Sequence, residues 1–232
     1  MSDGLLLIDK PSGVTSHDVV QVVRRALGIR RVGHTGTLDP MAQGLLVVLI
    51  GRATKCQHAL QAHDKAYEAV LQLGTQTDSA DAMGKPVLTA PVPPFDRAEV
   101  AALLKSFEGA CALTPPAFSA IKVRGRPAYW WARRQQPVQL SSRMVHLTDV
   151  TLMACDASTI AFHVQCSAGT YIRSLGEMIA ERLGTVGHLT KLVRVRIGAW
   201  SLNDAKPLTW IAQADRDTLI RELSSIPIPA SV

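Results

Sequence analysis

The sequence of 232 residues has few aromatic residues, few cysteines and no long apolar run. Aromatic residues make up 5% of the chain, so we expect a core built mainly of aliphatic side chains. The longest apolar run, Leu45 to Ile50, is far shorter than the roughly 20 residues that a membrane-spanning helix needs. Asp3 precedes another short apolar run at the N-terminus, which is untypical of a secretory signal. These absences predict a cytoplasmic protein that has no membrane partner.

The sequence also lacks the spacing of cysteine and histidine that metal sites use. Its 4 cysteines are dispersed and form no C-x-x-C pair, and a chain of this length needs no disulfide framework. The nearest two histidines, His58 and His63, would not share one face of a helix. We therefore predict reduced thiols and no metal site.

Acidic residues are missing from a long stretch in the second half of the chain. From residue 117 onward 14 Lys and Arg residues face 8 Asp and Glu residues, so the whole net charge of +6 arises there. The stretch without acidic residues contains Lys122, Arg124, Arg126, Arg133, Arg134 and Arg143, with Phe118, Tyr129, Trp130 and Trp131 among them. Such a segment can contact phosphates and stack on bases. A solvated basic loop is the alternative.

Hydrophobic periodicity predicts three helices. The first is capped by Ser16 and stops at Gly28, and the second starts at an Asp96 and Glu99 capping pair. The third carries an apolar stripe from Ile172 to Leu183. We read residues 115–143 as a long loop or insertion with a short helix near 128–135.

The same periodicity predicts strands separated by connectors. The expected strands are Leu5 to Ile8, Leu45 to Ile50, Tyr67 to Leu73, Val145 to Met153 and Ile160 to Cys166. The Pro-rich stretches 86–94 and 114–116 are read as connectors. This order indicates an α+β fold with a mixed, largely antiparallel central sheet, flanking helices and an inserted basic loop.

Glycines and polar residues are concentrated between Gly33 and Gly44. This loop contains three glycines, two threonines, His34 and one carboxylate, Asp39. Pro40 favours an extended backbone at Asp39, and the glycines allow a ligand to approach closely. The loop matches neither the phosphate loop nor the dinucleotide fingerprint. By residue type alone, Asp39 is more often a turn or capping residue than a catalyst.

The literal string of this loop, G-H-T-G-T-L-D-P followed by A-x-G, resembles the signature of the bacterial tRNA pseudouridine synthase B family. Further blocks that resemble the family follow its order at 7–17, 64–67, 73–81, 118–125 and 169–173. The resemblance covers about residues 4–200. It implies the pseudouridine synthase fold and the isomerisation of the T-loop uridine, position 55 of tRNA, to pseudouridine.

The resemblance implies a role for particular residues. Asp39 corresponds to the catalytic carboxylate, Tyr67 to the residue that stacks on the target base, and Arg173 to a partner of Asp39. The expected substrate-binding residues are His34, Tyr67, Tyr171, Leu192, Lys122, Arg124 and Arg126. The reaction breaks the bond from C1′ to N1 and joins C1′ to C5 without redox change, so no cofactor or metal is required. We expect a monomer that acts on the T-arm stem-loop without an obligatory protein partner.

Each of these residues also has an ordinary structural alternative. Tyr67 and Tyr171 could be half-buried aromatics, Leu192 a core residue, Arg173 a partner of Glu177 at i, i+4, and His34 a partner of a backbone group. The sequence also departs from the family at Ala168, where a lysine is usual, so a phosphate contact or ion pair expected there is absent. Many relatives continue into a C-terminal RNA-binding domain, whereas we expect a single catalytic domain over 1–232 with its insertion at about 115–143.

Two other functions are compatible with the fold. The chain could be an RNA-binding or tRNA-folding module with secondary or no catalysis, which the presence of Asp39, Tyr67 and Arg173 argues against. It could also be the subunit of a guide-RNA-dependent pseudouridine synthase. The absence of long charged tails makes that function less favoured.

Overall fold

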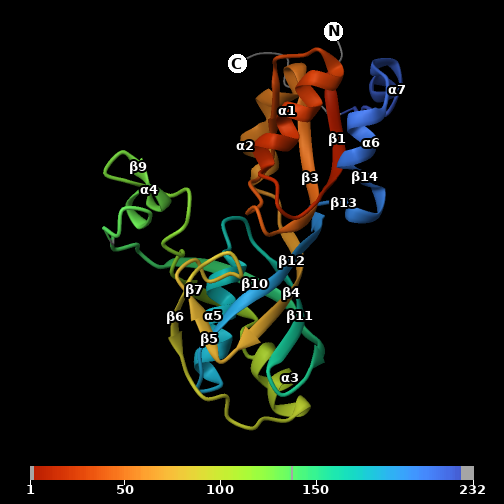
Figure 1. Cartoon of the computed structure of the whole chain (residues 1–232). Coiled ribbons are helices and arrows are strands. Elements are labelled where there is room, and N and C mark those ends of the chain that lie inside the picture. Colours follow the sequence, from red (N-terminus) through yellow and green to blue (C-terminus); the bar gives the residue numbers. More distant parts are fainter. Residues whose placement is uncertain (1–2, 137, 226–232) are drawn as a thin grey trace. The chain divides into compact units, whose positions relative to one another are not determined.

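The computed structural model describes residues 3–136 and 138–225. The chain folds into two compact units, the first formed by Met1–Tyr67 with Val193–Val232 and the second by Glu68–Leu192 (Figure 1). The boundaries between them fall inside strands β4 (Lys65–Leu73) and β12 (Gly187–Ile197). The predicted α+β class, with a mixed, largely antiparallel sheet and flanking helices, is confirmed.

The first unit is built around strands β1 and β3. Its other elements are α1 (Ser16–Leu27), β2 (Val32–His34), η1 (Gly51–Cys56), α2 (Gln57–Gln61), β13 (Trp200–Ser201), η2 (Leu202–Asp204), β14 (Lys206–Pro207), α6 (Leu208–Gln213) and α7 (Arg216–Arg221). Strand β1 (Gly4–Lys10) pairs antiparallel with β3 (Gln43–Ile50) and parallel with β14. Strand β3 also pairs antiparallel with β2 and parallel with the end of β12.

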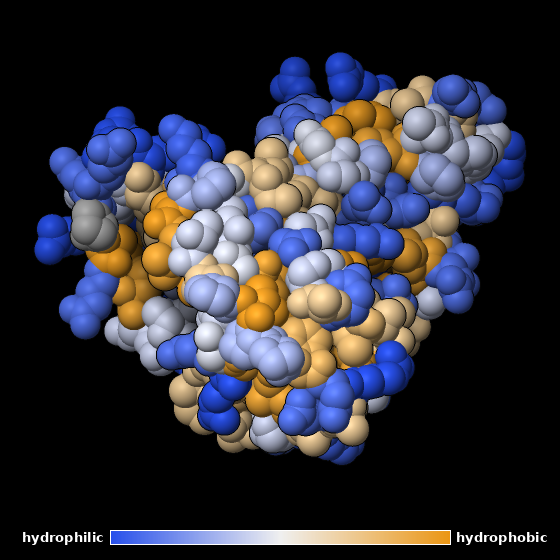
Figure 2. Space-filling view, turned by 60° about the horizontal axis from the view of Figure 1, so that its bottom comes forward, coloured by the Kyte–Doolittle hydropathy of each residue, from blue (hydrophilic) through white to orange (hydrophobic). Residues whose placement is uncertain are grey.

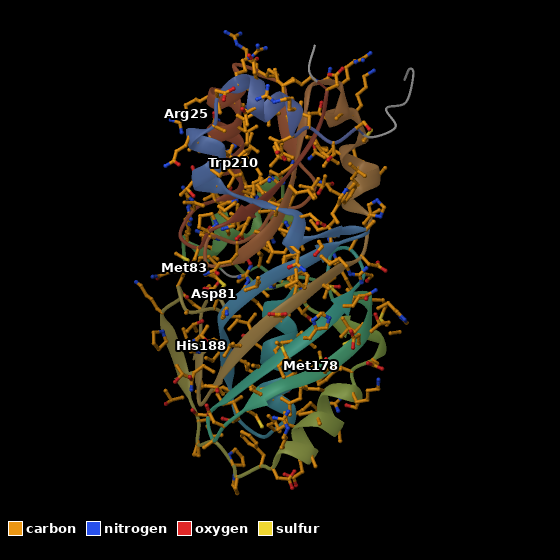
Figure 3. The ribbon with its side chains drawn as sticks, turned by 90° about the vertical axis from the view of Figure 1, so that its right-hand side faces the viewer. Arg25, Asp81, Met83, Met178, His188 and Trp210 are labelled. Carbon is orange, nitrogen blue, oxygen red and sulfur yellow. The ribbon has the colours of Figure 1, made fainter. Side chains whose placement is uncertain are left out.

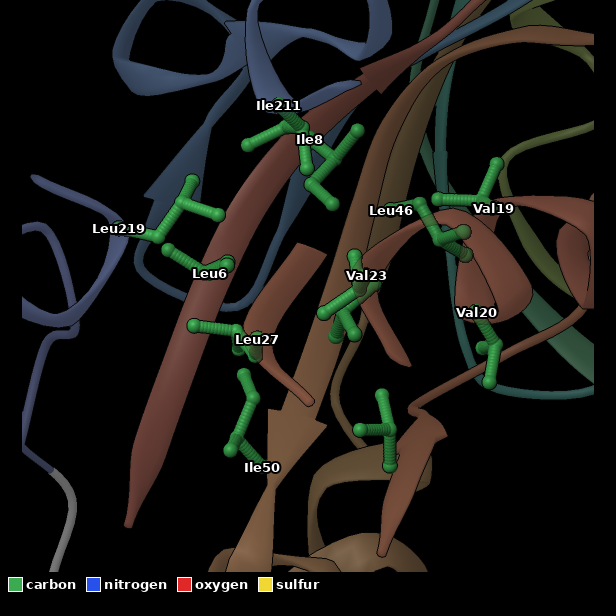
Figure 4. Packing of buried hydrophobic residues seen from close by; sticks show 12 residues of the cluster. Leu6, Ile8, Val19, Val20, Val23, Leu27, Leu46, Ile50, Ile211 and Leu219 are labelled. Atoms are coloured by element: carbon green, nitrogen blue, oxygen red, sulfur yellow. The ribbon is translucent and has the colours of Figure 1, made fainter. Parts of the chain in front are cut away.

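Both faces of β3 are covered, which explains its uninterrupted apolar sequence. The even-numbered residues 46, 48 and 50 pack in a cluster with α1, α6 and α7 (Figure 4). The odd-numbered residues 45, 47 and 49 pack in a second cluster with Ala53 and Ile197. Because side chains alternate between the faces of a strand, a strand buried on both faces must be apolar at every position.

The first helix is capped one residue earlier than predicted. Thr15 is the N-cap, and it forms a capping box with Asp18. Ser16, the residue predicted as the cap, is the first helical residue, and its hydroxyl contacts the backbone of Leu38. The predicted stop is confirmed, because Gly28 follows the helix with a φ of 67°.

The second unit contains the predicted strands β10 and β11 and the predicted helices α3 and α5. Its elements beside β4 and β12 are β5 (Thr75–Thr77), β6 (Pro86–Thr89), α3 (Arg97–Lys105), β7 (Gly109–Leu113), β8 (Lys122–Val123), β9 (Arg126–Pro127), α4 (Ala128–Ala132), β10 (Arg143–Cys155), β11 (Thr159–Cys166) and α5 (Ile172–Arg182). Strand β10 pairs antiparallel with both β11 and β7. The predicted capping box of Asp96 and Glu99 is confirmed at the start of α3.

Some predictions about this unit were wrong or incomplete. The Pro-rich stretch 86–94 was expected to be only a connector, but Pro86–Thr89 forms β6, which pairs with β5. Strands β7 and β12 were not predicted. Three basic residues interrupt the apolar alternation of β12, and one of them, Arg194, is buried. Alternation therefore could not reveal that strand.

The insertion occupies residues 114–142, between β7 and β10. These strands pair with Leu113 opposite Arg143, so the insertion leaves and re-enters the unit at adjacent positions. It contains the two-stranded pair of β8 and β9 and the short helix α4, which is shorter than the predicted segment 128–135. Hydrophilic side chains gather over this segment, at the left of Figure 2, around a smaller hydrophobic area.

Among residues 3–136 and 138–225, no helix is both long and apolar enough to cross a membrane. Within the same residues, no three His, Cys, Asp or Glu side chains are grouped as a metal ion would require.

Candidate active site

The loop that carries Asp39 connects β2 to β3 and is held on the side that precedes this residue. The hydroxyl of Ser16 accepts a hydrogen bond from the N–H of Leu38 at 2.8 Å and donates to the carbonyl of Leu38 at 3.2 Å. The carbonyl of Gly36 accepts a hydrogen bond from Arg194 at 3.1 Å. Helix α1 and strand β12 therefore both fix the approach to Asp39.

The same loop is also held on the side that follows Asp39. The carbonyl of Pro40 accepts from the N–H of Gly13 at 2.8 Å and from Nζ of Lys10 at 3.4 Å. The hydroxyl of Ser12 donates to the carbonyl of Met41 at 3.0 Å. The end of β1 and the segment that follows it thus fix the backbone just after Asp39.

Lys10 is a buried cation beside this loop. Its side chain is 0% exposed, and Nζ donates to the carbonyl of Val14 at 2.7 Å. Burial is the main cause that lowers the pKa of Lys10 to about 8; the charge of Arg194 acts in the same direction, and the carboxylates of Asp39 and Asp18 oppose it. The charges of Lys10 and Asp39 thus attract each other across this part of the loop.

Arg194 is a second buried cation in the first unit. It is 1% exposed, and its Nε donates to the carbonyl of Leu45 at 2.8 Å. Gly44 lies opposite it with a φ of 96°, and a Cβ at that position would overlap the backbone of Arg194. The last glycine of the loop is thus required for the close approach of β12 to the start of β3.

His34 lies at the end of β2, in surroundings that favour its neutral form. Burial, followed by the charges of Arg194 and His17, lowers its pKa. Its Nδ1 accepts a hydrogen bond from the N–H of Gly36 at 3.3 Å. His34 thus bonds to a backbone group, and the tautomer that this contact requires leaves Nε2–H as a donor. Its contact with a nucleotide stays a prediction.

In the second unit, Arg173 lies in the first turn of α5 and is 3% exposed. Its Nη1 donates to the carbonyl of Ser79 at 2.7 Å and its Nη2 to the carbonyl of Phe118 at 3.0 Å. Nη1 also lies 3.8 Å from Oδ2 of Asp81. Its pairing with Asp39 stays a prediction. Arg173 is therefore oriented within its own unit by the loop after β5 and by the insertion.

Glu177 lies one turn after Arg173 on α5. It accepts a hydrogen bond from Nε2 of Gln76 at 2.9 Å, which joins α5 to β5. Burial raises the pKa of Glu177, and the charge of Arg173 partly opposes this effect. The carboxylate of Glu177 is thus positioned by Gln76 of β5.

Asp81 is the centre of the loop between β5 and β6 (Figure 3). Its Oδ1 accepts from the hydroxyl of Ser79 at 2.6 Å and from the N–H of Met83 at 3.0 Å. The hydroxyl of Thr77 donates to its carbonyl at 2.7 Å. A Cβ on Gly84 would overlap Ser79, so the loop closes too tightly for a side chain there. This loop presents both a carbonyl and a carboxylate to Arg173.

Lys10, Arg194 and Asp81 belong to the site but were not predicted from the sequence. Lys10 and Asp81 lie in blocks that resemble the family, and both are charged residues next to buried segments. A charged residue beside a buried segment within such a block was the signal that could have predicted both residues. Arg194 carries no local signal, and only its burial and its contacts with Gly36 and Leu45 reveal its role.

Three further residues that the sequence predicts at the target base lie in β4, in β12 and at the start of α5. Tyr67 in β4 is 8% exposed and Leu192 in β12 is 5% exposed, so both are core residues of their strands. Tyr171 is the partly buried N-cap residue of α5. The roles of these three side chains at the target base stay predictions.

The basic side chains Lys122, Arg124 and Arg126 are exposed on the β8 and β9 pair. Arg124 and Gly125 form the connecting turn with φ values of 50° and 78°. Two successive positive φ values are typical of a type I′ turn, whose twist matches paired strands. The turn therefore places Arg124 at the tip of the insertion.

The aromatic rings of α4 are packed within the insertion. Arg134 lies 3.7 Å from the centre of the Trp130 ring, and Arg126 lies 5.5 Å from it. Trp131 packs edge-on against Trp130 at 4.8 Å and donates from Nε1 to the carbonyl of Val123 at 3.0 Å. These two rings hold the basic side chains in place, while Tyr129 is 40% exposed.

The sequence matches the family model described as TruB family pseudouridylate synthase (N terminal domain) over residues 24–172. The chain belongs to this family. The tRNA pseudouridine synthase B of Hydrogenovibrio crunogenus is 42% identical over 95% of this chain and 73% of its own length. That of Opitutus terrae is 44% identical over 89% of this chain and 86% of its own length. Membership confirms the resemblance inferred from the motif blocks.

Solved structures with the TruB-type fold agree with this assignment. A Cbf5 chain in a Cbf5-Nop10-Gar1 complex matches with a TM-score of 0.72 and 26% identity, over 95% of this chain and 59% of the other. The Cbf5 chain of an archaeal box H/ACA complex matches with a TM-score of 0.66 and 27% identity, over 90% and 52%. This chain thus spans little more than half of those chains, and the pseudouridine synthase fold is confirmed.

Proposed function

We propose that this pseudouridine synthase isomerises the T-loop uridine of tRNA, with Asp39 as the catalytic carboxylate. The observation that carries the proposal is the way the Asp39 loop is held on both sides, beside the buried cations Lys10 and Arg194. A carboxylate that acts as nucleophile or base must stay ionised, and nearby positive charge favours that form. Relatives named tRNA pseudouridine synthase B, at 42–44% identity, support tRNA as the substrate.

The reaction divides into steps that the proposed residues can serve. The bond from C1′ to N1 breaks, the uracil turns, C1′ joins C5, and the proton on C5 leaves while N1 takes up a proton. The uridine must first leave its stack, and Tyr67 and Leu192 would offer apolar contact to the extruded base. His34 would donate from Nε2–H, and Arg173 would pair with the carboxylate of Asp39. We expect no cofactor to take part, because the isomerisation has no net oxidation or reduction.

The T-arm would contact the exposed cations of the insertion. Lys122, Arg124 and Arg126 are presented on a short paired hairpin, which suits phosphate contacts along a stem. We expect one copy of the chain to act without a protein partner in the cytoplasm, where its substrate is. A guide-RNA-dependent subunit is the less supported function, because the Cbf5 matches are only 26–27% identical.

The test uses an unmodified T-stem-loop hairpin and whole tRNA, with pseudouridine mapped at nucleotide resolution. The wild-type chain should form it at the T-loop uridine of both. Asp39→Asn should abolish the product and keep the dissociation constant for RNA within a few fold, since it removes the charge and preserves the volume. Turnover by Asp39→Asn at a rate comparable to wild type would make Asp39 a turn residue. Pseudouridine that forms only when a guide RNA is added would favour the guide-RNA-dependent function.

A further inference from the structure

The start of α5 holds the first segment of the insertion at two points. We call residues 114–119 the insertion strut. The hydroxyl of Ser174 donates to the carbonyl of Thr114 at 2.6 Å, and Nη2 of Arg173 donates to the carbonyl of Phe118 at 3.0 Å. Ser174 is 7% exposed, and the two prolines between the contacts are buried. The strut is therefore fixed to two successive residues of one helix.

The strut also supports the basic part of the insertion. The N–H of Tyr129 donates to the carbonyl of Ser119 at 3.0 Å, and the N–H of Ala128 donates to the carbonyl of Ile121 at 2.7 Å. Helix α4 thus folds back onto the strut, and Trp131 fixes α4 to the end of β8. A displacement of the β8 and β9 hairpin would therefore move the strut as well, because these hydrogen bonds connect them.

Arg173 is shared between the strut and the Asp81 loop. Nη1 contacts the carbonyl of Ser79 and Nη2 contacts the strut, at opposite ends of one planar group. A guanidinium is rigid, so displacing one of its acceptors turns the whole group. The position of the strut is consequently part of what sets the orientation of Arg173.

We propose that Ser174 is a positioning residue that couples RNA seating on the insertion to the chemical step. By holding Thr114 against α5, it keeps Phe118 in place as an acceptor for Arg173. The inference rests on the proposed function, in which the insertion binds the T-arm and Arg173 pairs with Asp39. It adds that the insertion contributes to the rate of reaction as well as to affinity.

The test compares two serines that each form one hydrogen bond with Thr114. Ser174 bonds to its carbonyl from α5, whereas Ser142 bonds to its hydroxyl at 2.9 Å from within the insertion. Single-turnover rates are measured at saturating T-stem-loop hairpin, and dissociation constants with a hairpin that carries cytidine at the target position. Ser174→Ala should lower the saturating rate about tenfold or more, with the dissociation constant within about threefold of wild type. Ser142→Ala and Ser174→Thr should keep the wild-type rate.

A double-mutant cycle tests whether Ser174 acts through Arg173. Arg173→Lys replaces the two Nη groups with a single Nζ and so loses the fork that joins Ser79 to Phe118; adding Ser174→Ala to it should lower the rate by less than about twofold. A full additional tenfold loss there would overturn the proposal, as would a wild-type saturating rate in Ser174→Ala. Urea unfolding checks both alanine variants, and if Ser174→Ala fails to fold, Ser174→Cys replaces it with an intermediate loss expected. A wild-type chain that forms no pseudouridine would instead refute the proposed function.

Discussion

The hydroxyl of Ser16 exchanges two hydrogen bonds with the backbone of Leu38, accepting at 2.8 Å and donating at 3.2 Å. Leu38 precedes Asp39, so the first residue of α1 fixes the backbone next to the proposed catalytic carboxylate. The neighbouring Thr15 caps the same helix by accepting from the N–H of Asp18 at 3.1 Å. Two adjacent hydroxyls thus serve the site and the helix separately.

Ser16→Ala should lower the single-turnover rate about tenfold or more, because it frees the loop that positions Asp39. It also leaves the N–H of Leu38 buried without a partner, which costs about 1–3 kcal/mol of unfolding free energy. Thr15→Ala is the matched control. It removes the N-cap of α1, which should lower the free energy of unfolding by about 1 kcal/mol and leave the single-turnover rate unchanged. Equal rates in the two variants would remove the role assigned to Ser16.

The buried Lys10 should make stability depend on pH. Its pKa falls from 10.5 to about 8 on folding, so between these values the unfolded chain binds more protons and the free energy of unfolding rises with pH. From pH 7.5 to 10 this contribution amounts to about 2 kcal/mol. Urea unfolding at both pH values should show wild type gaining that much relative to Lys10→Met. Parallel pH dependences in the two proteins would contradict the buried state of Lys10.

Gly84→Ala should disturb Arg173 without touching it. The added Cβ would overlap Ser79 and Asp78, and Ser79 supplies a carbonyl to Arg173. Overpacking of this kind costs about 1–3 kcal/mol, and the single-turnover rate should fall together with stability. Lys85→Ala, an exposed change in the same loop, should alter neither quantity by much. A fully active Gly84→Ala would show that the loop does not set Arg173.

RNA affinity should depend strongly on salt through the insertion. Replacing Lys122, Arg124 and Arg126 together with Ala should flatten the log–log plot of affinity against salt by about 2, because each neutralised phosphate contributes roughly 0.7–0.9 to the slope. The control replaces Lys85 and Lys105, which are exposed outside the insertion. Filter binding over a range of salt concentrations gives the slopes. The same slope in wild type and the triple variant would mark the three residues as a solvated surface.

Much of the local structure followed from the sequence. The capping pair at Asp96 and Glu99, the stop at Gly28 and the apolar run of β3 depend on residues close in the chain, so their physics is visible in a short window. The glycine-rich loop that contains Asp39 and the basic, aromatic composition of the insertion were visible for the same reason, whereas the hairpin of β8 and β9 was not predicted. The motif blocks added the family, because their order carries information that single residues do not.

Only the tertiary structure decided how these residues are supported. Arg194 bonds to Leu45 across 149 residues, and Arg173 bonds to Ser79 across 94. Such contacts carry no local pattern, and a buried arginine hid β12 because it broke the alternation that marks a strand. Burial also set the pKa of Lys10, since sequence gives a lysine its ordinary pKa and only the surrounding protein can remove its water. The sequence by itself thus determined which groups are available and what turns they favour, while long-range packing determined which of them hold the proposed catalytic residues in place.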